Sequence, residues 1–263
     1  MRYRVLGTTH AFHDDGTPVA VGGARLRALL TALALRPGRT VPVGVLVGEV
    51  WDGDPPADGV AALQALIGRL RRTLGHKAVA STDGGYRLCA AEDDVDAHRF
   101  TRLAAEGTRA LASGDPVKAS ALLADALALW QGPALADLPD RASEATRWET
   151  RREEARRTGL AAALALGRAD EVLPELTALC DEFPLDERLR ALRIRALRDV
   201  GRPAEALAVY EEIRTTLADR LGADPGPELR ALHGELLVSV PASGNRAAVP
   251  AAPSRPSGLH HGP

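Results

Sequence analysis

Guanidinium and amide side chains recur on one side of the segment 59–74, the strongest candidate for chemistry in the sequence. At about 100° per residue, a helix here places leucine and isoleucine on one face. The opposite face carries small residues and arginines: Ala61, Ala65, Gly68, Arg69 and Arg72. Small side chains allow the helix to approach DNA closely. Arginine can form two hydrogen bonds with a guanine edge or bind a phosphate, and Gln64 on the flank can pair with adenine. The pattern favours a helix in a DNA major groove, and the alternative is a solvated arginine-rich face.

Further candidate contacts to DNA lie outside this segment. Two arginines open an earlier predicted helix, and a lysine and polar residues surround a predicted hairpin. With Arg71 on the flank of the first segment, the predicted DNA-binding residues are Gln64, Arg69, Arg71, Arg72, Arg25, Arg27, Lys77, Thr82, Tyr86 and Arg87. If about six phosphates are contacted, the logarithm of the affinity should fall against the logarithm of salt concentration with a slope of about -5.

No pattern for catalysis, a cofactor or a metal emerges from the sequence. There is no GxxxxGK[ST] loop and no GxGxxG after a predicted strand. Cysteine and histidine spacings do not resemble a zinc site, and His10 and His13 are interpreted as surface residues. Cys89 and Cys180 are interpreted as small apolar side chains in a reducing cytosol. We therefore expect no enzyme activity, no catalytic residue, no cofactor and no bound metal.

Short elements before residue 59 are predicted to support the candidate helix. The stretches 3–6 and 18–21 are β-prone around the turn 14–16. Leucines at 26, 29, 30 and 33 form one apolar stripe of a helix that Pro37-Gly38 ends. A second, short helix is predicted from near Pro42 to Trp51.

The candidate helix itself has a predicted cap, core face and stop. Asp58 is placed to cap it, and Gly75 to end it. Its core face is Leu63, Leu66, Ile67, Leu70 and Leu74. The stretches 78–82 and 86–89 then flank Asp83-Gly84-Gly85, a hairpin signal. The order of sheet, three helices and hairpin describes a winged helix-turn-helix.

The pattern from residue 95 to about 237 is wholly helical. Turn glycines begin three similar segments at Gly114, Gly167 and Gly201, and the last two are one tetratricopeptide period of 34 residues apart. The acidic stretch 92–94 is interpreted as a hinge, and Trp130, Trp148 and Tyr210 as core residues. The arginine run from 188 to 198 is interpreted as a solvated face or a partner surface.

We therefore predict a mainly α protein with two domains and a tail. Residues 1–90 form an α+β winged helix-turn-helix DNA-binding domain, and residues 95–238 an all-α, tetratricopeptide-like domain. Residues 239–263, rich in Pro, Ala, Gly and Ser, are predicted to be disordered. Residues 1–90 carry eleven basic and seven acidic residues, and the remainder 22 and 28, which fits one domain that meets phosphates. No run of about 18 apolar residues indicates a membrane span.

Several motifs resemble one known family, the Streptomyces antibiotic regulatory proteins. They include Gln64, Arg69-Leu70-Arg71-Arg72 and Leu74-Gly75, the earlier Gly22-Gly23-Ala24-Arg25-Leu26-Arg27, and the later Gly84-Gly85-Tyr86-Arg87-Leu88. Val95-Asp96-Ala97-His98-Arg99-Phe100 resembles the start of that family's bacterial transcriptional activation domain, and Leu129-Trp130-Gln131-Gly132-Pro133 also matches. The sequence departs from the family at Leu66 and Gly68, where tyrosine and serine are usual.

The resemblance implies a cytoplasmic, nucleoid-associated activator of secondary-metabolite (antibiotic) gene clusters. Such proteins bind direct repeats of double-stranded promoter DNA near the -35 region as side-by-side dimers and engage RNA polymerase holoenzyme. The winged domain is similar to that of OmpR-type response regulators, but no receiver domain with a phosphate acceptor is expected here. The alternatives are a tetratricopeptide-type scaffold that binds protein, or a repressor of the same fold.

Overall fold

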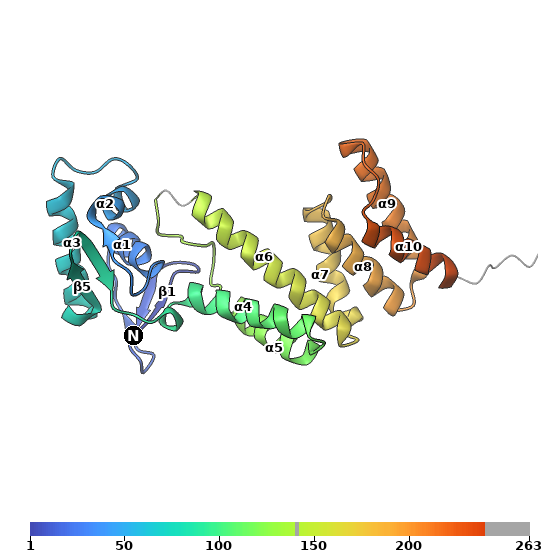
Figure 1. Cartoon of the computed structure of the whole chain (residues 1–263), viewed down its shortest axis with the longest axis horizontal. Helices are drawn as coiled ribbons and strands as arrows, with labels where there is room; N and C mark the ends of the chain where they lie inside the picture. Colours follow the sequence, from blue (N-terminus) through green and yellow to red (C-terminus); the bar gives the residue numbers. More distant parts are fainter. Residues whose placement is uncertain (140–141, 240–263) are drawn as a thin grey trace, which may run out of the picture.

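The computed structural model describes residues 1–139 and 142–239 of the chain. Its N-terminal elements are β1 (Arg2–Arg4), β2 (His10–Phe12), β3 (Pro18–Val19), α1 (Ala24–Ala34), β4 (Val41–Pro42), α2 (Val43–Trp51), α3 (Gly59–Leu74), η1 (His76–Ala78), β5 (Val79–Thr82), β6 (Gly85–Leu88) and η2 (Glu92–Asp94). The following helices are α4 (Asp96–Ala112), α5 (Pro116–Leu127), α6 (Ala142–Ala165), α7 (Ala169–Glu182), α8 (Glu187–Asp199), α9 (Pro203–Leu221) and α10 (Pro227–Ser239). The molecule is elongated, with α3 at one end and α9 and α10 at the other (Figure 1).

Two small antiparallel sheets frame the first three helices. One has the strand order β1-β2-β3, and the other has the order β4-β6-β5, with Tyr86 of β6 opposite both Val41 and Ser81. Gly84 closes the β5–β6 hairpin with a φ of 77°, a backbone conformation that favours glycine. The predicted winged helix-turn-helix is confirmed. The β5–β6 hairpin is its wing, and β4 pairs with β6 as the third strand of that sheet.

The prediction of a strand over residues 3–6 is wrong in its second half. Strand β1 ends at Arg4, and its partner β2, which we did not predict, is three residues long. The backbone of residues 5–7 instead pairs with a loop far along the chain. Gln131 N donates to Leu6 O at 2.8 Å, and Leu135 N donates to Val5 O at 3.0 Å. The carbonyl groups of this segment are therefore satisfied by a partner more than a hundred residues away.

The helical part is built from hairpins whose turns are glycines. The pairs α4–α5, α6–α7 and α8–α9 turn at Gly114, Gly167 and Gly201, with φ values of 80°, 74° and 76°. Glycine takes this left-handed conformation at little cost, whereas other residues are strained there. The predicted repeat of turn glycine, short polar entry and amphipathic helix is confirmed.

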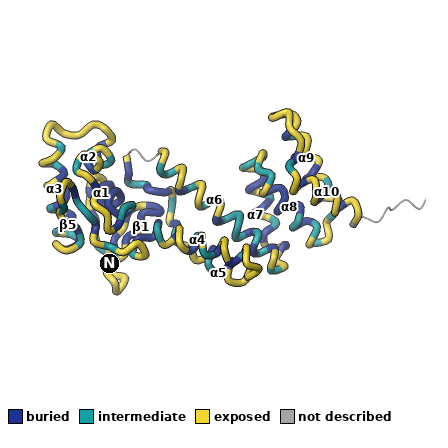
Figure 2. Tube along the Cα trace, viewed as in Figure 1, coloured by how far each residue is buried: buried dark blue, intermediate teal, exposed yellow. Residues whose placement is uncertain are grey.

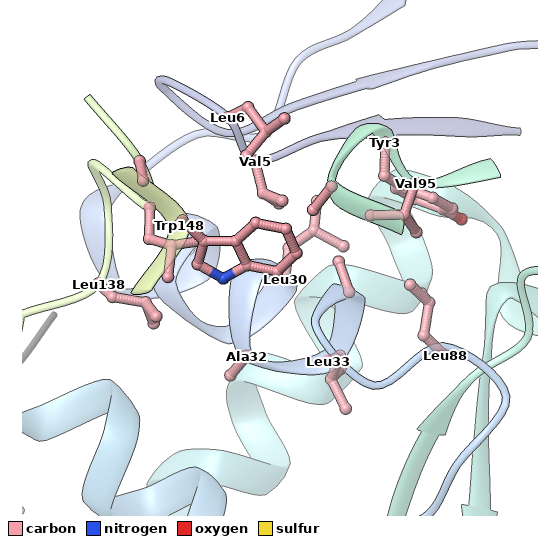
Figure 3. Packing of buried hydrophobic residues seen from close by; sticks show 14 of the residues in the cluster. Tyr3, Val5, Leu6, Leu30, Ala32, Leu33, Leu88, Val95, Leu138 and Trp148 are labelled. Atoms are coloured by element: carbon pink, nitrogen blue, oxygen red, sulfur yellow. The ribbon is translucent and has the colours of Figure 1, made fainter. Parts of the chain in front are cut away.

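One buried cluster runs through both predicted domains. It joins residues of α1, α2 and α3 to residues of α4, α5 and α6. The indole of Trp148, from α6, lies among Val5, Leu30 and Leu138, and its residue is 4% exposed (Figure 3). Two further clusters lie along α6 to α10. The domain boundary between residues 90 and 95 stays a prediction, and the hydrophobic core is continuous across it.

The residues interpreted as a hinge, 92–94, have regular local structure, and the hinge itself stays a prediction. These residues form the 3-10 turn η2, in which Asp94 accepts a hydrogen bond from Ala91 N at 2.9 Å. The next residue, Val95, is fully buried and bridges to Tyr3 of β1. The acidic composition suggested a solvated linker, but burial of Val95 fixes the chain at this point.

The arginine run of α8 is neither a plain solvated face nor a free cationic surface. Arg188 pairs with Glu154 of α6, and Arg195 pairs with Glu228 of α10. Arg190 is 2% exposed and pairs with Glu212 of α9. The run therefore links neighbouring helices, because its partners lie on elements distant in sequence.

The structure also describes the aromatic residues and cysteines that the sequence analysis named. Trp130, Trp148 and Tyr210 are buried, as predicted, and Cys180 is a buried free thiol. Cys89 is a free thiol that is exposed to solvent. The predicted disordered tail lies outside the described residues apart from its first residue, Ser239, which ends α10. No helix within the described ranges is long and apolar enough to cross a membrane.

Candidate nucleic-acid interface

Helix α3 has the cap, core face and stop that its sequence predicts. The Asp58 carboxylate accepts a hydrogen bond from Ala61 N at 2.9 Å, which satisfies one free N–H of the first turn. All five predicted core residues are buried: Leu63, Leu66, Ile67, Leu70 and Leu74. After Leu74, Gly75 leaves the helical conformation with a φ of 97°. Burial of one stripe against α1 and α2 fixes which face of α3 meets solvent.

The exposed face of α3, here called the α3 ridge, consists of small and cationic residues. Its exposed members are Ala61, Gln64, Ala65, Arg69 and Arg72, with Gly68 partly exposed between them. The ridge lies at the end of the molecule opposite α9 and α10 (Figure 1). The loop from 52 to 58 that leads into α3 is also exposed (Figure 2). This end of the chain is therefore exposed to solvent.

Arg71 ties α3 to the wing. Its Nε donates to Val79 O at 2.8 Å, and its Nη2 donates to Ser81 Oγ at 2.9 Å. Both acceptors lie on β5, so the guanidinium fixes the angle between the helix and the hairpin. Together these hydrogen bonds should stabilise the arrangement by about 1–3 kcal/mol, because the bond to Ser81 is exposed to solvent. Arg71, predicted to bind DNA, thus has a positioning role within the protein.

The wing is held against β4 by a close backbone approach. A Cβ atom added at Gly85 would lie 2.1 Å from Val41 O, so only glycine fits there. Thr82 Oγ1 donates to Gly85 O at 3.1 Å across the hairpin turn. Of the other residues predicted to bind DNA from this region, Lys77 is exposed, and Tyr86 and Arg87 are half-buried.

The two arginines of α1 have different surroundings. Arg27 faces inward, where its Nε donates to Asp137 Oδ1 at 2.7 Å, with the two side chains 29% and 10% exposed. The other oxygen of Asp137 accepts from Thr9 N at 2.7 Å. Arg25 is exposed, with its guanidinium carbon 5.6 Å from the centre of the Trp51 ring. Arg27 therefore joins the winged part to the loop after α5, whereas Arg25 stays on the surface.

Asp96, like the Arg27–Asp137 pair, connects the winged part to the helical part. Its carboxylate accepts hydrogen bonds from Val5 N at 2.8 Å, Leu6 N at 3.1 Å and Ala97 N at 2.8 Å. Burial raises the pKa of Asp96 to about 6, and the three N–H groups act in the opposite direction. Sequence reasoning missed this residue, although a carboxylate at the first position of an apolar helix start is a cue to capping.

The structure brings most of the predicted DNA-facing residues to one end of the molecule. Gln64, Arg69 and Arg72 lie on the ridge, and Lys77, Thr82, Tyr86 and Arg87 lie on or beside the wing. Arg27 is turned away to Asp137. Sequence reasoning also missed Val60 in the first turn of α3, which is 50% exposed. Among the described residues, no group of three or more histidine, cysteine or acidic side chains could hold a metal ion.

Two family models match the chain. The model described as "Transcriptional regulatory protein, C terminal" matches residues 18–88. The model described as "Bacterial transcriptional activator domain" matches residues 95–237, more than half of the chain.

The chain is similar to proteins from Streptomyces and Mycobacterium. The regulatory protein DnrI of Streptomyces peucetius is 36% identical, and the alignment covers 97% of this chain and 98% of DnrI. The regulatory protein AfsR of Streptomyces griseus is 41% identical over 90% of this chain, which spans only 24% of AfsR. A solved structure, Mycobacterium tuberculosis EmbR in complex with a low affinity phosphopeptide, has a TM-score of 0.82 and 35% identity, covering 91% of this chain and 65% of that chain. The predicted fold class is confirmed.

Proposed function

This chain belongs to the Streptomyces antibiotic regulatory protein family of transcriptional regulators, and on that premise we propose that it is a sequence-specific activator that binds double-stranded promoter DNA. Helix α3 enters the major groove with Gln64, Arg69 and Arg72 nearest the bases. The wing, from Thr82 to Arg87, contacts the adjoining backbone or minor groove. Lys77 and Arg25 add phosphate contacts at the edges of this surface.

The observation that carries the proposal is the α3 ridge. It presents small side chains, one amide and two guanidiniums on one exposed side of the helix, while the leucines on the other side are buried. A major groove about 12 Å wide admits one helix, and arginine and glutamine match guanine and adenine edges. Helix α3 lies at the end of the molecule opposite α9 and α10, so we expect a duplex bound there to stay clear of both helices (Figure 1).

Finer features of the function follow from the family. We propose that the chain activates an antibiotic or other secondary-metabolite gene cluster from direct repeats near the -35 region. Protomers lie side by side on the repeats, and the helical part meets RNA polymerase holoenzyme. The match to the bacterial transcriptional activator domain and the similarity to regulatory proteins of Streptomyces support this. Such a protein works in the cytoplasm at the nucleoid.

A gel shift with promoter DNA tests the proposal. The full chain should shift its promoter fragment, and the double variant Arg69→Ala with Arg72→Ala should lose at least about tenfold in affinity. The matched control is Arg220→Ala with Arg230→Ala, which removes the same charge from exposed positions on α9 and α10. A protein-binding scaffold gives no shift, and equal loss in both double variants also contradicts the proposal.

Transcription in vitro separates an activator from a repressor of the same fold. With purified holoenzyme and a weak promoter, addition of the full chain should raise the transcript yield. The Arg69→Ala, Arg72→Ala variant should leave it unchanged. A fall in transcript yield on addition of the chain contradicts activation while leaving DNA binding intact.

A further inference from the structure

Helix α3 has an exposed valine in its first turn, Val60, whose side chain is not part of the hydrophobic core. Val60 is 50% exposed in the first turn, next to the cap formed by Asp58 and Ala61 N. Single exposed apolar residues are ordinary on protein surfaces. Val60, however, lies four positions before Gln64, so the two side chains are neighbours on one side of the helix.

The exposed side chains of α3 differ between its two halves. In the first two turns, Val60, Ala61 and Ala65 offer only methyl groups, and Gln64 is the single exposed side chain there that can form hydrogen bonds. Both exposed arginines of the helix, Arg69 and Arg72, belong to the second half. The helix therefore presents an apolar half with one amide and a cationic half.

The apolar half matches one kind of base pair. In the major groove thymine alone shows a 5-methyl group, which apolar side chains contact, and adenine shows the N6 and N7 pair that glutamine binds through its amide. A recognition helix contacts base edges mainly through its N-terminal residues. Guanine, in contrast, is recognised by arginine, which begins only at Arg69.

We infer that the first half of α3 reads A·T base pairs, with Val60 and Ala61 against thymine 5-methyl groups and Gln64 on an adenine. The operator then has an A·T step beneath this half and guanine contacts beneath Arg69 and Arg72. The inference rests on the proposed DNA binding. A duplex is the occupant that fits this surface, because the α3 ridge, which includes Ala61 and Gln64, also carries two guanidiniums, and a polyanion complements them.

The test begins with a duplex selected by the full chain from a random-sequence pool. Its thymines are replaced one at a time by deoxyuridine, which removes only the 5-methyl group. At the thymine under Val60, the wild-type affinity should fall about fourfold, as expected for one buried methyl group. Val60→Ala should bind the thymine duplex about fourfold more weakly and show no further loss with deoxyuridine at that position.

Val45→Ala is the matched control. Val45 is 42% exposed on α2, and its removal should leave the deoxyuridine effect unchanged. Circular dichroism of each variant checks that the helices are intact. If Val60→Ala keeps the deoxyuridine effect, or if the selected site has no A·T pair under the first half of α3, the inference is overturned while DNA binding stands. If the chain selects no duplex at all, the proposed function itself fails.

Discussion

The salt dependence of DNA binding should separate the cations that meet phosphates from those that hold the protein together. Seven cationic residues were predicted to face DNA: Arg25, Arg27, Arg69, Arg71, Arg72, Lys77 and Arg87. Arg27 is paired with Asp137, and Arg71 donates to Val79 and Ser81 of the wing. Five of these seven cations remain for the duplex.

Each phosphate neutralised contributes about 0.9 to the slope of log affinity against log salt, so we expect a slope between about -2.7, if Arg69 and Arg72 contact bases alone, and about -4.5, if all five cations contact phosphates. Arg69→Ala and Arg72→Ala should each make the slope shallower by about 0.9 wherever the guanidinium holds a phosphate. Arg27→Ala should leave the slope unchanged and lower the free energy of unfolding by about 1–3 kcal/mol, because it breaks a charged hydrogen bond. Arg71→Ala should behave like Arg27→Ala.

Fluorescence anisotropy with a labelled operator, between about 50 and 200 mM KCl, measures these slopes. Urea unfolding of the same variants measures their stability. The assignment of Arg27 and Arg71 as positioning residues is refuted if Arg27→Ala or Arg71→Ala makes the slope shallower by about 0.9. A wild-type slope near zero would contradict phosphate contact altogether.

Three further predictions concern the scaffold. In Gly85→Ala the new Cβ would overlap Val41 O, so this variant should lower the free energy of unfolding by several kcal/mol. In Gly84→Ala the only strain is the positive φ, and the loss should be about 1–2 kcal/mol. Urea unfolding measures both, and equal losses would contradict the close approach of Gly85 to Val41. The pKa of Asp96 in the folded protein is raised to about 6 from an ordinary value of 3.8, so the folded state binds the proton more tightly than the unfolded state does. As pH rises from about 4 to 6, the free energy of unfolding of the wild type should therefore fall by up to about 3 kcal/mol relative to that of Asp96→Asn. A rise of the wild-type value relative to the variant over that range would contradict this prediction. Trp148→Ala should lower the free energy of unfolding by about 3–5 kcal/mol, since the indole is buried in the shared cluster, and a loss under 1 kcal/mol would be incompatible with that packing.

The sequence predicted best what depends on neighbouring residues. The bounds of α3 followed from Asp58, the apolar stripe and Gly75, all within one segment of the chain. The turn glycines of the helical hairpins were predictable for the same reason, because a left-handed turn is a local requirement. The exposed ridge then follows from the helix and its buried stripe.

Long-range partners could not be predicted in this way. Arg27 looked like any cation at a helix start until Asp137, 110 residues away, was placed beside it. Residues 5–7 have a β-prone composition, but the loop around Gln131 supplies their partners. The arginines of α8 depend likewise on acidic residues of α6, α9 and α10. Strand β2 is too short for any periodicity to appear.

Methylation protection of guanine N7 by the bound protein tests most directly whether α3 occupies the major groove, since N7 is exposed only there. With the full chain bound to its operator, we predict protection of guanines beneath the second half of α3. That protection should disappear in Arg69→Ala with Arg72→Ala at protein concentrations that still saturate the duplex. Bound complexes that leave every guanine N7 reactive, or a protection pattern that the double variant retains, would contradict the placement of the α3 ridge in the groove.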